Sequence, residues 1–254
     1  MHDRPMEELR PAQIVAARER SGCAFVPVSP TVEWHSYHLP TGTDALVSEA
    51  LCRLAAERVG GVWLRPLPLG LDEWRPPETL RQWGFNGNEA IFGMRFPGLP
   101  LTSEYGEADT LHDLVACRIA ALKGTGFRHV FLVNHHGGRG QHAALDQIAA
   151  ATSDSAFHVY AVRTYQFNTL GAAFDGTGGH AGYSETHWVL AFRPELVDTS
   201  ALPAGTLSVR EFGILHDTPL IPEKYNPRNC SLEIANALRE NVVENFVAFV
   251  QRQQ

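Results

Sequence analysis

Short apolar runs alternate with helical segments along the chain, and this alternation most constrains the fold. Runs of strand length occupy residues 23–29, 62–69, 128–134 and 157–164. Helical patterns occupy residues 10–21, 45–59, 109–123, 140–152, 181–193 and 231–251. Strands separated by helices pair in parallel and are covered on both faces. The order therefore predicts an α/β fold, a three-layer α/β/α sandwich with a mostly parallel central sheet.

No internal repeat or low-complexity linker divides the chain, so residues 1–254 are expected to form a single domain. Residues 71–107 are rich in Gly, Pro and Asn and are expected to be irregular.

Composition excludes several classes of protein. The formal net charge is −7, and no clustered Lys and Arg would bind phosphate, so neither nucleic acid nor an anionic membrane is an expected partner. No run of 18 apolar residues is present, so no membrane span is expected. The polar N-terminus does not resemble a signal peptide, and four scattered cysteines without a CxxC pattern indicate buried thiols in a reducing cytoplasm.

Three clusters of polar side chains follow predicted strands or precede a helix. They occupy residues 33–44, 134–138 and 178–187. In open α/β sheets, ligands bind beyond the carboxyl ends of the strands, so these distant segments could converge on one site. His, Asp and Glu ligands without Cys suit Zn²⁺, Mn²⁺ or Fe²⁺ in an open catalytic site. No glycine-rich phosphate loop is present, which argues against a nucleotide cofactor.

Each cluster also has an ordinary structural interpretation. Asp44 could simply cap the helix that follows it. His35 and His38 could be hydrogen-bonded loop histidines, and His135 and His136 could belong to an incidental turn. Glu185 could be a surface acid favoured by a helix dipole.

The three clusters together resemble the motifs of the creatininase (creatinine amidohydrolase) family. The first motif is Glu-x-His, then His-Leu-Pro, then Asp eleven residues after the Glu; here it is Glu33-Trp34-His35, His38-Leu39-Pro40 and Asp44. The second is Asn134-His135-His136-Gly137-Gly138, and the third is His180-Ala181-Gly182-Tyr183-Ser184-Glu185-Thr186 followed by Pro194-Glu195-Leu196-Val197-Asp198. The resemblance extends from about residue 10 to residue 250.

This resemblance implies a two-metal hydrolase that opens amide bonds and assembles as a homohexamer, a trimer of dimers. It implies that Glu33, His35, Asp44 and His136 are metal ligands, with Asp44 bridging, and that His180 is the catalytic histidine. Creatininase has a further Glu ligand where this chain has Gly138, so Glu185 is nominated as the remaining ligand.

Departures from the family pattern all fall near the expected pocket. Gly176 replaces a Trp that closes over creatinine, so creatinine itself is not the expected substrate. Ser36-Tyr37 replaces Gly-Pro, and His135 replaces Gly. Tyr37, His135 and Trp83 are therefore predicted to contact substrate, with Trp83 on a long aromatic loop, residues 71–95, that forms either a lid or a subunit interface.

The predicted function is a cytoplasmic amidohydrolase with two divalent ions per chain. It would open a cyclic amide or cleave a formamide or other amide of a small molecule. Two alternatives remain open. One is a peptidase acting on short peptides, and the other is a metal-dependent isomerase or lyase acting on a small carbonyl or sugar-like substrate.

Overall fold

A four-stranded parallel sheet forms the centre of the protein, as the alternating pattern predicts. The computed structural model describes residues 4–171 and 179–254. The strands are β1 (Cys23–Pro27), β2 (Val62–Trp63), β3 (His129–Asn134) and β4 (His158–Arg163), in the spatial order β2-β1-β3-β4. All three pairings are parallel, and Cys23 to Pro27 of β1 pair in register with His129 to Val133 of β3.

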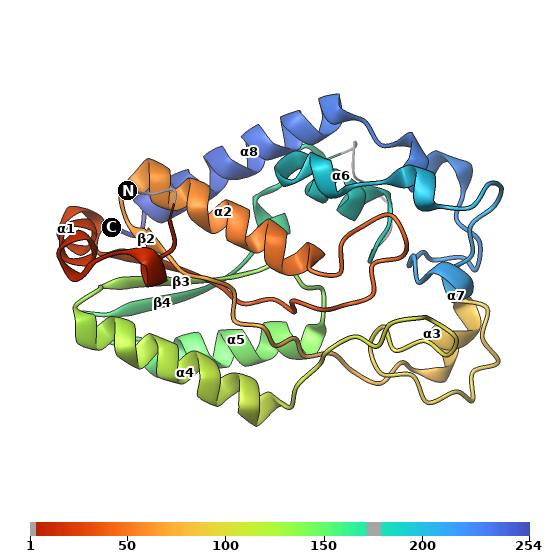
Figure 1. Cartoon of the computed structure of the whole chain (residues 1–254). Coiled ribbons are helices and arrows are strands. Elements are labelled where there is room, and N and C mark those ends of the chain that lie inside the picture. Colours follow the sequence, from red (N-terminus) through yellow and green to blue (C-terminus); the bar gives the residue numbers. More distant parts are fainter. Residues whose placement is uncertain (1–3, 172–178) are drawn as a thin grey trace.

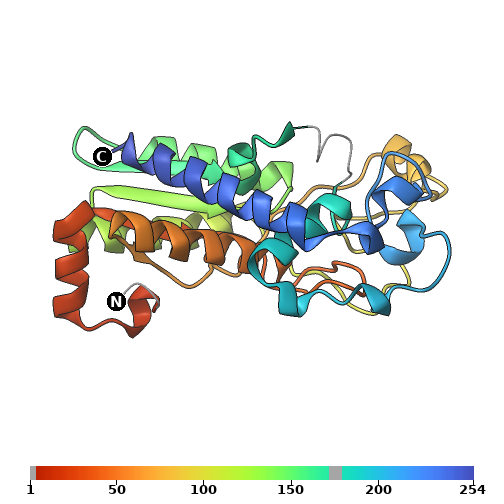
Figure 2. The ribbon, with the colours of Figure 1, turned by 90° about the horizontal axis from the view of Figure 1, so that it is seen from above.

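Helices cover both faces of this sheet (Figure 1). On one side lie α2 (Thr43–Val59), α6 (Tyr183–Phe192) and α8 (Leu232–Gln251), and on the other lie α4 (Ala108–Thr125) and α5 (Arg139–Thr152). The helix α1 (Pro11–Ser21) lies at the end of the sheet where both termini are found, as Figure 2 also shows. Short 3₁₀ helices cover Met6–Glu8, Thr164–Phe167, Pro194–Leu196, Thr199–Ala201, Glu223–Tyr225 and Pro227–Asn229.

The strands are buried on both faces because their side chains alternate between two separate cores. Phe25 and Phe131 stack at 5.2 Å between ring centroids and pack beneath α2 and α8. Val26 and Leu132 point to the other core, among side chains of α4 and α5. A strand buried on both faces reads as a continuous apolar run, which is why β1 and β3 were recognisable in the sequence.

Two local predictions concern the chain after α2. Residues 62–69 were expected to form a strand that its prolines shorten; β2 ends at Trp63, and beyond it an isolated bridge joins Leu67 to Val28. Pro66 and Pro68 have no backbone N–H, so the hydrogen-bond ladder cannot continue. Residues 71–107 were expected to be irregular throughout, but they contain the helix α3 (Pro77–Gln82).

A third apolar cluster stabilises the end of the molecule beyond the sheet. It joins the segment around α3 to the segment around α7 (Val209–Phe212), and its largest members include Leu80, Trp83 and Phe96. Figure 1 shows α3 and α7 next to each other at the end opposite the termini. This cluster holds the long connection after β2 beside the carboxyl ends of the strands.

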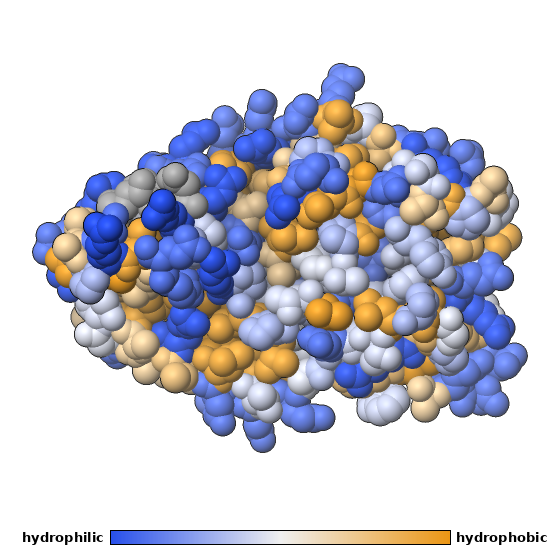
Figure 3. Space-filling view, in the orientation of Figure 1, coloured by the Kyte–Doolittle hydropathy of each residue, from blue (hydrophilic) through white to orange (hydrophobic). Residues whose placement is uncertain are grey.

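The outer surface is mixed in character. On the face drawn in Figure 3, apolar side chains form several patches that hydrophilic residues separate. No helix in the described ranges is both long and apolar enough to cross a bilayer.

Candidate metal centre

The loop between β1 and α2 carries three of the predicted ligands. Glu33, His35 and Asp44 are each 1–2% exposed. Asp44 does not cap α2, because the N-cap residue is Gly42 and no side chain caps that end. The carboxylate of Asp44 instead turns into the protein, next to residues of the second polar cluster. The capping interpretation of Asp44 is therefore wrong.

Backbone strain in this loop occurs where the chain departs from the family pattern. Ser36 has a φ of 62°, a left-handed conformation that costs a residue with a Cβ atom roughly 1–2 kcal/mol. Its hydroxyl group is buried and has no hydrogen-bond partner within residues 4–171 and 179–254. A glycine would adopt this conformation without strain, which gives a physical reason for glycine at this position in the family motif.

His136, at the carboxyl end of β3, faces two carboxylates. Its Nδ1 atom lies 3.1 Å from Asp44 Oδ2 and 3.2 Å from Glu33 Oε2. Its Nε2 atom lies 3.0 Å from the carbonyl oxygen of Leu71 and donates a hydrogen bond to it. A backbone acceptor on one ring nitrogen fixes the tautomer and leaves the other nitrogen free to bind a metal ion.

His35 is held in the same way on the other side of Asp44. Its Nδ1 atom lies 3.2 Å from the carbonyl oxygen of Glu33, which accepts its hydrogen bond. Its Nε2 atom lies 3.8 Å from Asp44 Oδ1 and 3.6 Å from Glu185 Oε2. Glu185 reaches this point from the first turn of α6, where its carboxylate accepts a hydrogen bond from the backbone N–H of Ala181.

These residues form two triads that share Asp44. In each triad, one ligand atom per residue lies within 4.8 Å of the others; the triads are Glu33, Asp44, His136 and His35, Asp44, Glu185. Among the described residues, three of their buried atoms find no hydrogen-bond partner: Glu33 Oε2, His35 Nε2 and Asp44 Oδ1. Because an unpaired buried polar atom is costly, these atoms are suited to a cation, and the donor set fits a pair of divalent ions.

The pKa shifts of these groups also favour a bound cation. Burial opposes the charged forms of both imidazoles, but the facing carboxylates outweigh burial and raise the pKa of His136 well above its usual value and that of His35 to about 9. Burial likewise opposes the charge on Asp44, but the hydrogen bond from His136 and the nearby charge of His35 hold its pKa well below its usual value. The carboxylates thus require neighbouring positive charge, and metal binding would replace the imidazole protons.

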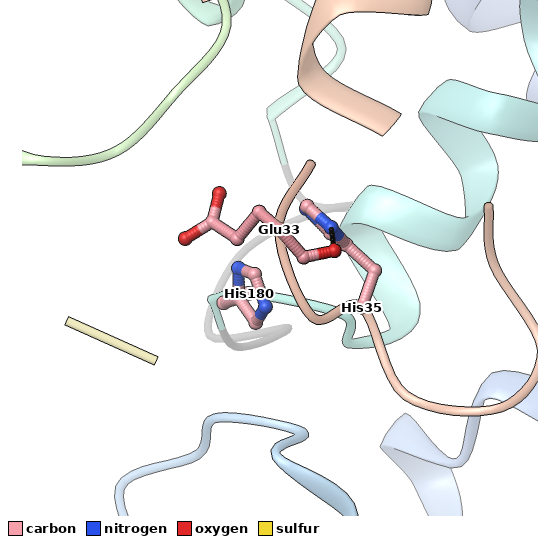
Figure 4. A group of neighbouring side chains, drawn as sticks. All are labelled: Glu33, His35 and His180. Carbon is pink, nitrogen blue, oxygen red and sulfur yellow. Dashed lines mark hydrogen bonds between the residues drawn. The ribbon is translucent and has the colours of Figure 1, made fainter. Parts of the chain in front are cut away.

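His180 lies against this centre, as Figure 4 shows, with its ring centroid 4.2 Å from that of His35. Its Nε2 atom donates to the carbonyl oxygen of Trp34, and its Nδ1 atom lies 4.0 Å from Glu185 Oε2. Burial and the charge on His35 lower the pKa of His180 to about 4, so its ring is neutral at pH 7. Glu33, His35 and His180 also form a third possible ligand triad.

A cavity of about 390 Å³ opens over the two triads. His135 lines it, packs against Trp188 with the two rings tilted and 4.9 Å between their centroids, and hydrogen-bonds Thr164. Burial lowers the pKa of His135 to about 4, so this ring is neutral as well. The structure therefore brings His135 together with the predicted ligands and His180.

Two predicted substrate contacts are not at this cavity. Tyr37 is 50% exposed and packs edge-on against Trp34 and Phe212. Trp83 is buried in the third apolar cluster, where it packs against Phe96. Neither side chain is among the described residues that line the cavity. His38 also lies outside the triads, and its Nε2 atom hydrogen-bonds Thr186 at 2.9 Å.

The sequence analysis missed several residues that the structure places at the site. Tyr105 hydrogen-bonds Glu33 and accepts the backbone N–H of Met94 at 3.0 Å. Asp72 and Arg75 line the cavity and pair at 2.7 Å. These three residues come from the irregular segment after β2, where no periodicity marks one residue over another; only the i, i+3 spacing of Asp72 and Arg75 hinted at a pair.

The structure also explains why no ligand can come from position 138. A Cβ atom on Gly138 would lie 2.2 Å from the Leu71 carbonyl oxygen and 2.5 Å from His136 Nε2. The segment that supports His136 therefore occupies the space that a Glu side chain would need. Gly176, the other position where the chain departs from creatininase, lies outside the described residues.

The fold and this site together define a class of protein. It is a parallel α/β sandwich with a buried centre of carboxylates and imidazoles at the carboxyl edge of its sheet. Residues 7–250 match the family model described as "Creatininase: Creatinine amidohydrolase". The chain belongs to the creatininase family.

Solved structures share the fold at low sequence identity. A creatinine amidohydrolase (creatininase) is 21% identical, with 98% of this chain and 96% of that chain covered and a TM-score of 0.68. A structure described as "Creatininase Mn" is 20% identical over 98% and 97%, with a TM-score of 0.68, and a mutant described as "Zn-Zn type" is 21% identical over the same shares, with a TM-score of 0.67. A putative creatinine amidohydrolase from Bacteroides fragilis is 20% identical over 96% and 90%, with a TM-score of 0.63. No curated protein sequence matches the chain.

Proposed function

We propose that this protein is a two-metal amidohydrolase that acts on a small-molecule amide other than creatinine. Glu33, Asp44 and His136 would hold one divalent ion, and His35, Asp44 and Glu185 would hold the other. Zinc, manganese and iron all suit this donor set. The substrate would be a cyclic amide or a formamide, for which a cavity of about 390 Å³ is large enough.

The observation that carries this proposal is the position of Asp44 between the two triads. Its Oδ2 atom faces His136, and its Oδ1 atom faces His35 and has no hydrogen-bond partner in the part of the chain that the structure describes. A carboxylate that presents one oxygen to each of two ligand sets is the arrangement that a bridging ligand needs. A purely structural buried acid would instead have both oxygens hydrogen-bonded.

The chain's own side chains would then position the substrate and move protons. The ions would supply Lewis acidity and lower the pKa of water to near neutrality. His180 is neutral, Nε2 donates to Trp34, and Nδ1 has no hydrogen-bond partner among the described residues. It could accept a proton at Nδ1 from the attacking water and pass the same proton to the leaving nitrogen, because a low pKa makes the protonated ring a good acid. His135, which also lines the cavity, could hydrogen-bond the substrate.

Substrate screening with product analysis tests the proposal. Purified protein should contain one to two divalent ions per chain, and a chelator should abolish turnover that added manganese or zinc restores. Hydrolysis of cyclic amides, formamides and dipeptides would be followed by the release of an amine and a carboxylate. A product with the same mass as the substrate would indicate isomerisation, and full activity without metal would refute the proposal.

A further inference from the structure

Arg75 brings a permanent positive charge to a cavity that is lined by several acids. Among the described residues that line the cavity, it is the only Lys or Arg side chain. Its side chain is 15% exposed. The acids that line the cavity are Glu33, Asp44, Glu185 and Asp72, of which only Asp72 lies outside the two metal triads.

Three contacts hold the guanidinium group of Arg75 in place. Nη2 donates to Asp72 Oδ2 at 2.7 Å, and Nε donates to the Gly93 carbonyl oxygen at 3.2 Å. The group also lies over the Trp83 ring, 5.6 Å from its centroid. The second oxygen of Asp72 is occupied by the backbone N–H of Glu73 at 2.8 Å. Asp72 therefore anchors Arg75 and has little capacity left for a ligand.

One end of this guanidinium group remains available. Within the described residues, Nη1 has no hydrogen-bond partner, and it is not among the buried polar atoms that lack one. An anchored arginine with free donors at one end can bind a carboxylate through two parallel hydrogen bonds. Because the group is already oriented, a ligand would lose little conformational freedom on that side.

Arg75 is also tied to the metal centre through a short stretch of backbone. Asp72 follows Leu71, whose carbonyl oxygen holds His136 at 3.0 Å. A small substrate in this cavity could thus reach both the metal triads and Arg75. Trp83, which lies outside the cavity, would influence the substrate through its contact with Arg75.

We propose that Arg75 recognises a carboxylate group on the substrate, so that the substrate class is anionic amides. This inference rests on the proposed amidohydrolase function. Two other roles would leave a different signature. If Arg75 only held residues 71–95 in place, its loss would weaken folding and would weaken the binding of every ligand to the same degree. If it acted only through its charge on the reaction centre, anionic and neutral substrates would lose turnover equally.

Matched ligand pairs distinguish these roles. Binding to manganese-loaded protein is measured by calorimetry for N-formylglycine, pyroglutamate and glycylglycine, each against its neutral amide. The variants are Arg75→Met and Arg75→Lys, with Arg95→Met as control. Arg95 is a suitable control because it lies on the same segment, donates from Nε to a backbone carbonyl at 3.0 Å and stacks on Phe92, but does not line the cavity.

At least one pair should bind the wild-type protein roughly 10–100-fold better as the carboxylate, the range expected for hydrogen bonds to a charged group. Arg75→Met should remove this preference without weakening the neutral amide, Arg75→Lys should keep part of it, and Arg95→Met should keep all of it. Metal content and the unfolding midpoint show whether each variant is folded. If Arg75→Met does not fold, Arg75→Lys provides the test.

The inference fails if no pair shows a preference for the carboxylate, if the preference survives in Arg75→Met, or if both members of a pair lose affinity equally. Failure of the proposed function looks different. In that case no amide is hydrolysed, whereas a carboxylate preference that depends on Arg75 can still be measured by calorimetry, with or without added manganese. Hydrolysis without any carboxylate preference would refute the role of Arg75 alone.

Discussion

Asp44→Asn should weaken the binding of both metal ions at once, because the two triads share this residue. Asn has nearly the same shape as Asp, so the substitution leaves no cavity in the protein interior, although residue 44 is only 2% exposed. It does replace one carboxylate oxygen by an NH₂ group and removes the negative charge. One triad then loses a ligand atom, and the other retains only a neutral oxygen.

The size of the effect can be bounded from the geometry. Asp44 Oδ2 is 3.1 Å from His136 Nδ1, and Oδ1 is 3.8 Å from His35 Nε2, so each oxygen serves a different triad. Loss of an outer-shell partner typically costs 10–100-fold in metal affinity, so loss of a direct ligand should cost at least roughly 100-fold at each ion. That corresponds to about 2.7 kcal/mol per ion.

The assay is a competition titration against a fluorescent chelator, with metal content measured in parallel. Wild-type protein should show two binding steps. Glu33→Gln should weaken one step, Glu185→Gln should weaken the other, and Asp44→Asn should weaken both. Asp72→Asn is the matched control, because Asp72 is a buried carboxylate of the same cavity that belongs to neither triad.

The bridging role is refuted if Asp44→Asn keeps either ion at wild-type affinity. Unchanged binding at both ions in Glu185→Gln would remove Glu185 from the ligand set and leave it a role in substrate binding or structure. A large loss of metal in Asp72→Asn would show that any buried charge in this cavity affects metal binding, and the comparison would then carry no information about bridging.

Four further predictions concern catalysis, stability and assembly. His180→Ala should keep both metals yet slow turnover by roughly 10²–10⁴-fold, the range for a lost general acid–base; loss of metal in this variant would make His180 a ligand instead. Burial, together with the charges of His35 and Arg228, lowers the pKa of His38 to about 3. The folded protein therefore keeps this ring neutral, and its full stability is present above the ordinary His pKa of roughly 6.5. Stability is lost as the pH falls from 6.5 towards 3, because the unfolded chain binds a proton that the folded protein does not. Urea unfolding in chelator should therefore show a steeper loss of stability with acid in the wild type than in His38→Gln, by up to about 1.4 kcal/mol per pH unit, and identical slopes would show that His38 titrates normally. Ser36→Gly should raise the free energy of unfolding by up to about 1 kcal/mol, because it relieves the left-handed φ of 62°; thermal unfolding measures this, and a destabilised variant would contradict the strain. Sedimentation should give about six chains per particle, as in the family that the sequence resembles, and a stable monomer at micromolar concentration would refute this assembly.

The order of elements and the presence of polar clusters at the strand ends could be inferred without a structure. Buried parallel strands such as residues 129–134 have an unmistakable apolar run, and the helices show a 3.6-residue period. Glu33 and His35 also stand out, because acids and imidazoles in a loop after a strand have few structural uses. These signals are local patterns, so they can be recognised from the sequence without a structure.

The segment from residue 71 to residue 107 could not be interpreted in the same way. Its conformation depends on the third apolar cluster, in which Leu80, Trp83 and Phe96 pack against residues from the other end of the chain. Trp83 was expected to contact the substrate because it lies on the long aromatic loop near the expected pocket, yet it is buried against Phe96 and lies beside Arg75. No local pattern distinguishes these two fates of a Trp side chain.

The sequence by itself determined the fold class and the residue types available to a metal centre, because periodicity and motif spacing are properties of the chain. Only the tertiary structure decided that Asp44 faces both triads, that Glu185 reaches His35 at 3.6 Å, and that Leu71 closes the space beside Gly138. These facts depend on contacts between residues that are tens to more than a hundred positions apart. Tertiary packing sets these distances, because each depends on how the helices and the long connection after β2 pack against the sheet.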